Sequence, residues 1–167
     1  VLSERFFVLG LDKKQEVSGL FDVIHICFPY SRGFIRDVKS YVGTYLQNGG
    51  LVVIHSTVPI GTTKKIGSFA VHSPIRGVHP YLEDGIKTFV KYFGGLKAHE
   101  AAEIFGDLGI KCVVSSNSNE TEAIKLWDTT AYGWNIVLEK EIWEFCQKNH
   151  LDFDFVYAHA TDSYNSG

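Results

Sequence analysis

Short apolar runs alternate with amphipathic stretches along most of this chain. Residues 21–28 and 51–54 are nearly continuous apolar runs, the pattern of strands that are covered on both faces. Between them, apolar side chains recur at helical spacing over residues 34–46, and Asn48-Gly49-Gly50 predicts the end of that helix. A strand, a helix and a strand with short connections predict a right-handed parallel crossover.

The same pattern predicts several further elements. We expect a short strand over 5–12, a short helix over 62–69, an irregular stretch or short strand over 71–80, a strand over 88–93, a helix over 97–108 and a strand over 110–114. Such an alternation of strands and helices is typical of the α/β class. The sequence therefore predicts one parallel sheet with flanking helices.

A single long helix is predicted over residues 119–149, where apolar side chains recur at steps of three and four. At a rise of 1.5 Å per residue such a helix is about 45 Å long, more than a small domain covers. We therefore expect part of it to pack on another domain or subunit. The predicted domains are residues 1–117 and, with the helix and the start of a second or dimerising region, residues 118–167.

The segment Ser56-Thr57-Val58-Pro59-Ile60-Gly61-Thr62-Thr63 directly follows the apolar run 51–54. Hydroxyls at the end of a parallel strand can reach a ligand in the crevice that open α/β sheets form there. Serine and threonine also favour turns and helix caps, so spacing alone leaves both interpretations open. Phe28-Pro29-Tyr30-Ser31 ends the preceding strand and is expected to line the same edge of the crevice.

Two charged side chains are candidates for ligand contacts outside these loops. Asp12 would end the first strand and could bind ribose hydroxyls, although a solvated turn residue fits its position equally well. The glycine fingerprint that precedes such an acid by about 20 residues is absent from this sequence. Arg76, close to His79, could bind a phosphate or carboxylate with its fork of donors, or it could bind backbone carbonyls.

On the long helix, Lys125 and Thr129 are four residues apart and share a face, with Asp128 as a possible partner of the lysine. A lysine on a helix could bind an anionic ligand or stabilise a developing oxyanion. A solvated lysine in a local ion pair is the alternative.

Composition narrows the class of protein. The chain has 167 residues, of which 45% are hydrophobic and 21% charged, which suits one sizeable core. Its formal net charge of -3, without a basic stripe, argues against nucleic-acid binding. No apolar run approaches the ~20 residues that span a bilayer, and no signal pattern opens the chain, so we expect a cytoplasmic protein without membrane contact. Methionine is absent, including at position 1, which suggests a segment of a longer polypeptide.

Cysteine and histidine give little sign of a metal site. Cys27, Cys112 and Cys146 are odd in number, widely spaced and flanked by apolar residues, so buried reduced thiols are expected. No histidine pair has the helical spacing of a zinc motif. We therefore expect no metal.

The segments above resemble the UDP-glucose/GDP-mannose dehydrogenase family, whose members oxidise the primary alcohol of a nucleotide sugar to a carboxylate with NAD. The segment from Ser56 to Thr63 is similar to the family's Ser-Thr-Val-Pro-Val-Gly-Thr. Three further matches follow in the family's order: Ser73-Pro74, a strand ending in Gly94-Gly95, and Glu122-Ala123-Ile124-Lys125-Leu126 at the start of the long helix. The resemblance implies an incomplete Rossmann-like domain that lacks its glycine-rich first unit.

The resemblance also implies a cofactor, a substrate and site residues. NAD would contact Asp12, the segment Phe28 to Ser31, Ser56 and Thr57. Thr57 would help to hold the reaction-centre water and the nicotinamide, and Lys125 would stabilise the oxyanion. The implied substrate is a nucleotide sugar or a related small hydroxylated anion bound by Lys125. Arg76, from its residue type, is expected as a further substrate contact, Thr129 as a further catalytic residue, and the long helix as the interface of a homodimer.

Three departures from the family keep other functions open. Ile75 stands where the family has Glu after Ser-Pro, Thr129 stands where it has Asn, and no cysteine lies in the glycine-rich context of the family's nucleophile. The isolated chain is therefore expected to be a poor catalyst or none. The alternatives are a 3-hydroxy-acid or 6-phosphogluconate type dehydrogenase, and a non-catalytic dimerising or ligand-binding module.

Overall fold

The computed structural model describes residues 1–12, 15, 17–77 and 80–165. Contacts divide the chain into two compact units, Val1–Lys125 and Leu126–Gly167. Helix α5 (Ser118–Lys148) begins in the first unit and continues into the second. The predicted boundary after residue 117 stays a prediction.

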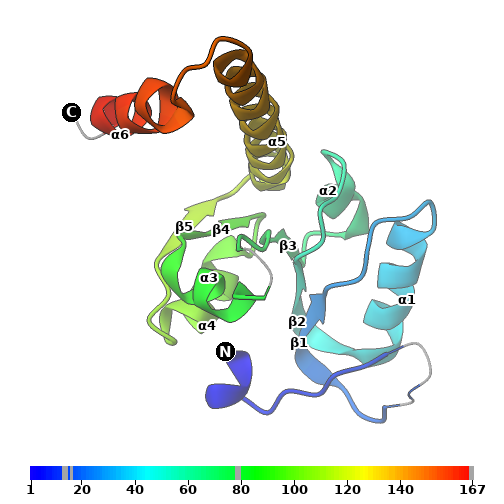
Figure 1. Cartoon of the computed structure of the whole chain (residues 1–167). Helices are drawn as coiled ribbons and strands as arrows, with labels where there is room; N and C mark the ends of the chain where they lie inside the picture. Colours follow the sequence, from blue (N-terminus) through cyan, green and yellow to red (C-terminus); the bar gives the residue numbers. More distant parts are fainter. Residues whose placement is uncertain (13–14, 16, 78–79, 166–167) are drawn as a thin grey trace. The chain divides into compact units, whose positions relative to one another are not determined.

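The first unit contains a five-stranded sheet in the order β1-β2-β3-β4-β5 (Figure 1). Its strands are β1 (Phe21–Ile26), β2 (Leu46–Ile54), β3 (Ala70–His72), β4 (Lys91–Gly94) and β5 (Cys112–Ser115). All neighbours pair in parallel except β3 and β4, which are antiparallel and meet at His72 and Gly94. The predicted α/β class is confirmed, but the sheet is mostly rather than wholly parallel, because the burial pattern of a strand does not record its direction.

Helices cover both faces of the sheet in the first unit. The helices of this unit, apart from the start of α5, are η1 (Leu2–Glu4), α1 (Phe34–Tyr45), α2 (Thr62–Ile66), α3 (Leu82–Thr88) and α4 (Ala98–Gly106). Phe34 and Val38 of α1 pack with Val52 and Ile54 of β2 in one apolar cluster. Alternate residues of the same strand, such as Val53, pack in a second cluster with α4 (Figure 1). The two-sided burial that the apolar runs predicted is confirmed for residues 51–54 of β2, whereas β1 is an edge strand whose residues are mostly half-buried.

Three local predictions are wrong. Residues 5–12 form no strand, because among the described residues no neighbouring strand pairs with them. Gly49 does not end the preceding helix but lies within β2 with a φ of 83°, beside an irregular pairing of β1 with β2. Thr88 ends α3, a helix that the sequence pattern did not show, so the predicted strand 88–93 begins only at Lys91.

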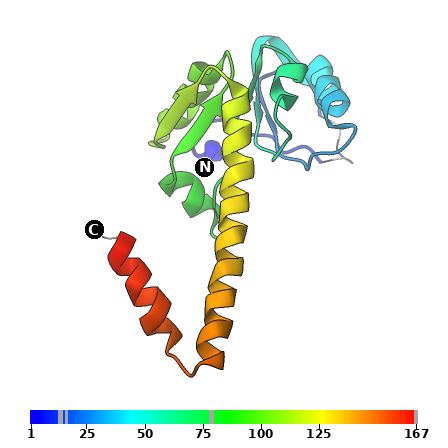
Figure 2. The same cartoon turned by 90° about the horizontal axis from the view of Figure 1, so that it is seen from above.

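The second unit is helical. The predicted long helix is confirmed to within one residue at each end, and Figure 2 shows α5 as one uninterrupted helix. A π-helical turn, η2 (Asp154–Ala158), and α6 (His159–Asn165) follow it. Within the described residues, none of the helices combines the length and the apolar character that crossing a bilayer requires.

The three thiols differ in exposure. Cys146 is buried, Cys112 is half-buried and Cys27 is exposed, and all three are free. The prediction that all three are buried is therefore wrong for Cys27, which directly follows the edge strand β1.

Candidate functional site

The loop that follows β2, residues 56–61, is fastened to the end of β1. The Ser56 hydroxyl donates a hydrogen bond of 2.6 Å to the Phe28 carbonyl oxygen, and the His55 amide donates to the Ile26 carbonyl. The ends of the two strands therefore lie side by side, as the sequence predicted. We call residues 56–61 the Ser56 loop.

Thr57 is an exposed corner of the Ser56 loop between two buried residues. Ser56 is 8% exposed and Val58 1%, whereas the Thr57 side chain faces solvent and makes no hydrogen bond within the described part of the chain. Gly61 has a φ of 87°, a conformation that favours glycine, where the loop turns into α2. The loop thus presents one hydroxyl on a backbone that is anchored on both sides.

Glu122 of α5 anchors the far end of the Ser56 loop. Its side chain is fully buried, and its carboxylate accepts hydrogen bonds from the amides of Gly61 at 2.5 Å and Thr63 at 2.8 Å. The Thr63 hydroxyl donates a third bond of 2.6 Å to the same carboxylate. These donors belong to the first turn of α2 and the residue before it, whose amides have no partner within the helix.

His72 links the near end of the Ser56 loop to α5. Its Nε2 lies 3.2 Å from the Ser56 carbonyl oxygen, and its Nδ1 lies 3.0 Å from the Thr121 hydroxyl. Burial lowers the pKa of His72 to about 4, so the ring is neutral at pH 7. Because a carbonyl only accepts, Nε2 carries the proton and Nδ1 is an acceptor that faces the Thr121 hydroxyl, whose one proton is also within hydrogen-bond distance of the Ser118 carbonyl oxygen, at 3.0 Å.

Because Gly94 of the sheet has no side chain, α5 can begin close to the sheet. A Cβ built on Gly94 of β4 would lie 2.5 Å from the Thr121 hydroxyl oxygen and 2.9 Å from the Ser118 Cα. Both distances are too short for a real contact. The glycine is therefore required for the close approach that brings Thr121 to His72.

Lys125 follows on the same helix, four residues after Thr121, and so shares a face with it. The half-buried lysine donates a hydrogen bond of 3.0 Å to the Ile75 carbonyl oxygen. Its positive charge is one of the causes that lower the pKa of His72, after the dominant effect of burial. Lys125 is thus held near the histidine that contacts the Ser56 loop.

The remaining predicted site residues are dispersed. Phe28 packs on Phe34, and the exposed Tyr30 also lies against that ring, whereas Pro29 and Ser31 are exposed. Arg76 lies over the rings of Phe89 and Tyr92, at 5.5 and 5.9 Å from their centroids. Its predicted neighbour His79 is outside the described residues.

Asp12 and Thr129 are not brought to the Ser56 loop by any described contact. Asp12 is exposed on a segment without regular structure, so the expectation that it ends a strand is wrong. Thr129 is exposed and lies in the second unit. Their roles in a site stay predictions.

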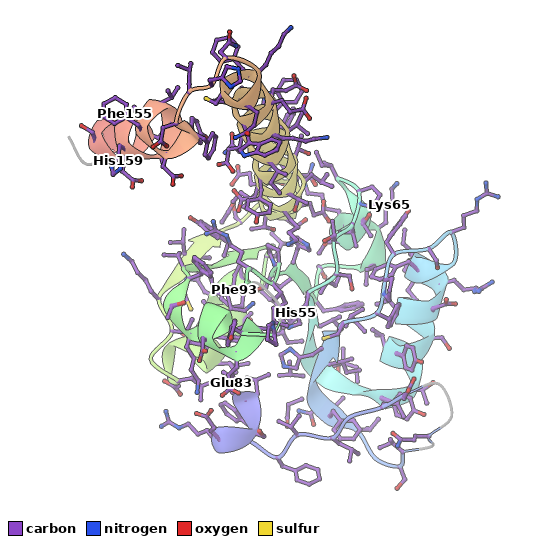
Figure 3. All side chains as sticks on the ribbon, viewed as in Figure 1. His55, Lys65, Glu83, Phe93, Phe155 and His159 are labelled. Atoms are coloured by element: carbon purple, nitrogen blue, oxygen red, sulfur yellow. The ribbon has the colours of Figure 1, made fainter. Side chains whose placement is uncertain are left out.

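A second polar cluster lies inside the first unit, and the sequence did not reveal it. His25 Nδ1 is 3.0 Å from His55 Nε2, and His55 Nδ1 is 2.7 Å from the Ser73 carbonyl oxygen. Burial lowers the pKa of His25 to about 4 and that of His55 well below its usual value. Lys91 is 5% exposed, and burial lowers its pKa to about 8. Figure 3 shows His55 and Phe93 in the interior of this unit.

A cavity elsewhere in the first unit is lined by neither Thr57 nor Lys125. It has a volume of about 810 Å³ and runs along the edge strand β1, where Val23, His25 and Cys27 line it together with apolar residues of the segment 6–11. Within the described residues, no group of three or more His, Cys, Asp or Glu side chains is arranged to hold a metal ion.

The strand ends fit a nucleotide cofactor only in part. The paired ends of β1 and β2 offer the edge at which open α/β sheets bind ligands. The glycine-rich turn that holds a pyrophosphate is absent from the sequence. The residues present could therefore contact the nicotinamide side of NAD, and they supply no pyrophosphate cradle.

Sequence reasoning did not assign a role to Glu122, Thr121 or His72. Glu122 was visible only as part of the segment that resembles the family. No local signal singles it out as a buried carboxylate, since polar residues precede it from Ser118 to Thr121.

Comparison with known proteins gives sequence relatives for most of the chain. No family model matches. The chain is 27% identical over 124 residues to the UDP-N-acetyl-D-mannosamine dehydrogenase of Methanococcus vannielii, covering 69% of this chain and 29% of that protein. The enzyme of the same name from Methanococcus maripaludis is 28% identical over the same length. The chain thus spans about 29% of the length of these curated relatives.

Solved structures show the shared fold. The UDP-D-ManNAc dehydrogenase of Pyrococcus horikoshii superposes with a TM-score of 0.74 at 20% identity, over 84% of this chain and 40% of that one. The UDP-N-acetyl-mannosamine dehydrogenase of Staphylococcus aureus gives 0.68 at 17% identity, over 87% of this chain and 42% of that one. The chain is therefore related to the nucleotide-sugar dehydrogenases, and its resemblance to the UDP-glucose/GDP-mannose dehydrogenase family is confirmed.

Proposed function

We propose that this chain supplies part of the cofactor and substrate site of an NAD-dependent nucleotide-sugar dehydrogenase. The observation that carries the proposal is the connection between the Ser56 loop and the start of α5, made by Glu122 and by the His72 bridge. This connection ties the loop that presents the exposed Thr57 hydroxyl to the helix that carries Lys125. The names of the sequence relatives support a nucleotide sugar as the substrate class.

The cofactor would lie against Phe28, Pro29, Tyr30, Ser31, Ser56 and Thr57. NAD supplies a hydride acceptor for the oxidation of an alcohol carbon. The Ser56 hydroxyl is already committed to the Phe28 carbonyl, so its role is to shape the loop. A solved neighbour at 16% identity, Psf3, is described in complex with NADP+, and NADP therefore belongs in the same binding test.

Thr57 and Lys125 would act on the substrate side. The Thr57 hydroxyl can donate to and accept from a ligand or an ordered water. The Lys125 ammonium has three donors, so its bond to the Ile75 carbonyl is compatible with binding an oxyanion. Arg76 and Thr129 are proposed only as secondary contacts. We propose no thiol step for this chain, since none of its cysteines has the glycine-rich context that the family uses.

Calorimetric titration of the chain with NAD tests this function. We expect saturable binding that weakens about tenfold in Thr57→Ala, since a lost hydrogen bond to a bound ligand costs about 1 kcal/mol or more. Thr44→Ala, on the exposed face of α1, is the matched control and should bind like the wild type. A folded chain that binds neither NAD nor NADP would contradict the proposal.

Titration with UDP-N-acetyl-D-mannosamine in the presence of NAD tests the substrate class. Lys125→Met should weaken this binding while leaving NAD binding nearly unchanged. Ile75 has no carboxylate to bind sugar hydroxyls, and this favours the rival reading of a simpler 3-hydroxy acid as substrate. Binding of a 3-hydroxy acid without binding of the nucleotide sugar would establish that rival.

We further propose that the second unit forms a homodimer through α5. Its side chains include exposed Trp127, Tyr132 and Trp134, at 66–73% exposure, and large exposed apolar surfaces mark interaction sites. Sedimentation of the chain should show a dimer. A dimer that binds no cofactor would favour the alternative of a non-catalytic dimerising module. The three free thiols support a cytoplasmic location, because free thiols are usual in reducing compartments.

A further inference from the structure

The buried carboxylate of Glu122 is satisfied entirely by the Ser56 loop and the start of α2. Its side chain is fully buried, and one oxygen accepts from both the amide and the hydroxyl of Thr63 while the other accepts from the Gly61 amide. Within the described residues, no Lys or Arg forms an ion pair with Glu122. A buried carboxylate is stable only when hydrogen bonds replace its lost hydration. The pairing of Glu122 with this loop is therefore specific.

Glu122 also has a fixed relation to Lys125. The two residues are three apart in α5, so one rigid helical turn sets their separation. Residue 121, next to Glu122, fixes the other end of the Ser56 loop through His72. Consecutive side chains of one helix thus hold both ends of the loop that presents Thr57.

We propose that Glu122 is a positioning residue that fixes the Ser56 loop relative to Lys125 and so sets the distance between the Thr57 hydroxyl and the lysine ammonium. The importance of this distance for ligand binding rests on the proposed function, whereas the anchoring of the Ser56 loop by Glu122 does not. Without Glu122 the loop keeps its tie to the Phe28 carbonyl at one end but loses the tie at Gly61.

Glu122→Gln is the sharpest variant because it preserves size and shape. Gln has one acceptor oxygen and one NH₂ group, so it can satisfy either Thr63 or Gly61 but not both. With the oxygen on Thr63, the NH₂ group would face the Gly61 amide, donor against donor. Glu141→Gln is the matched control, since it makes the same change of charge at an exposed position of the same helix.

Amide hydrogen exchange by NMR tests the anchoring without any ligand. We expect exchange at Gly61 to be at least tenfold faster in Glu122→Gln than in the wild type, with Val53 unchanged and with no change in Glu141→Gln. Thr63→Val removes only the hydroxyl donor and should give a smaller increase at Gly61 and Thr63. It also provides the decisive comparison if Glu122→Gln does not fold. Unchanged exchange at both amides in the folded variants would overturn the proposal.

A double-mutant comparison of NAD binding tests the positioning role. Glu122→Gln should raise the Kd for NAD about tenfold, and Thr57→Ala should add little in that background, because a displaced hydroxyl no longer contributes. Additive effects of the two substitutions would show a merely structural role and overturn the positioning. If the wild type fails to bind NAD, the proposed function fails, and the exchange rates still decide whether Glu122 anchors the loop.

Discussion

Helix α5 buries polar side chains at its start and exposes apolar side chains further along, the reverse of the usual distribution. In its first two turns the polar residues Ser118, Thr121 and Glu122 are at most 2% exposed. After Lys125 most of the large apolar residues are exposed, with Trp127 at 70% and Trp134 at 73%. Buried polar groups with partners specify one arrangement, whereas exposed apolar groups indicate a surface that another molecule covers. The same helix thus provides the support of a site at its start and a candidate interface further along.

The largest effect is expected from acid, which should destabilise the buried polar groups of the first unit, among them the His72 bridge to the start of α5. The pKa values of His25 and His72 are about 4 in the folded chain, against 6.5 for an ordinary histidine, so the unfolded chain binds more protons between these values. The stability that the two neutral rings provide is complete above pH 6.5 and is lost as the pH falls through 4. The expected loss is about 3 kcal/mol for each ring.

Urea unfolding at a series of pH values from 7 to 4 measures this loss. His72→Gln removes one titrating ring and should make the decline with falling pH shallower, even if the variant is less stable at pH 7. A free energy of unfolding that stays constant from pH 7 to pH 4.5 would contradict the assignment of neutral buried rings.

Removal of the Glu122 side chain should have the next largest effect. Glu122→Ala leaves the two amides and the Thr63 hydroxyl without their acceptor, with the Thr63 groups buried and the Gly61 amide partly buried, at a cost of about 3 kcal/mol. Trp134→Ala, in the exposed region of the same helix, should change the free energy of unfolding of the monomer, measured at a concentration too low for association, by less than about 0.5 kcal/mol. Equal losses in urea unfolding would remove the contrast between the two regions.

Gly94→Ala should push the start of α5 away from the sheet. The added methyl group would overlap Thr121 and the Ser118 backbone, and overpacking of this kind costs about 1–3 kcal/mol. Gly43→Ala is the matched control, because Gly43 lies inside α1 with open space around its Cα. Alanine there should stabilise the chain by about 0.5–1 kcal/mol. If Gly94→Ala were more stable than Gly43→Ala in thermal unfolding, the start of α5 would not depend on close contact with Gly94.

A substitution in the exposed region should act on association and barely on stability. Trp134→Glu places a charge on the proposed interface, so the dimer should weaken at least tenfold in sedimentation equilibrium. The free energy of unfolding of the monomer should stay within about 0.5 kcal/mol of the wild type. An unchanged dimer would exclude this face as the interface.

The apolar pattern predicted the elements whose burial is periodic. Strands β1, β2 and β5 and helices α1 and α4 lie where their apolar side chains recur, since these side chains pack in the two clusters. Helix α5 was predicted from the same periodicity, although most of its large apolar side chains after Lys125 are exposed. Helix α3 escaped prediction because Gly85 is its only buried residue. The antiparallel pairing of β3 with β4 depends on strand direction, which no burial pattern records.

The candidate site was predictable only where it is local in sequence. Ser56 and Thr57 follow a buried strand, so their position at its end could be read from the order of residues. The hydrogen bonds of Glu122 to Gly61 and Thr63 join residues that are 61 and 59 positions apart. Such contacts depend on how α5 docks on the sheet, and no spacing within one element reveals them.

Mapping of NAD contacts by NMR on the isotope-labelled chain tests the central claim most directly. If the Ser56 loop and the start of α5 form one site, the amides of residues 28–31, 56–61 and 121–125 should shift on titration, with the largest changes next to Thr57. Shifts confined to the groove along β1, or the absence of shifts at residues 56–61 in a saturated complex, would contradict the account.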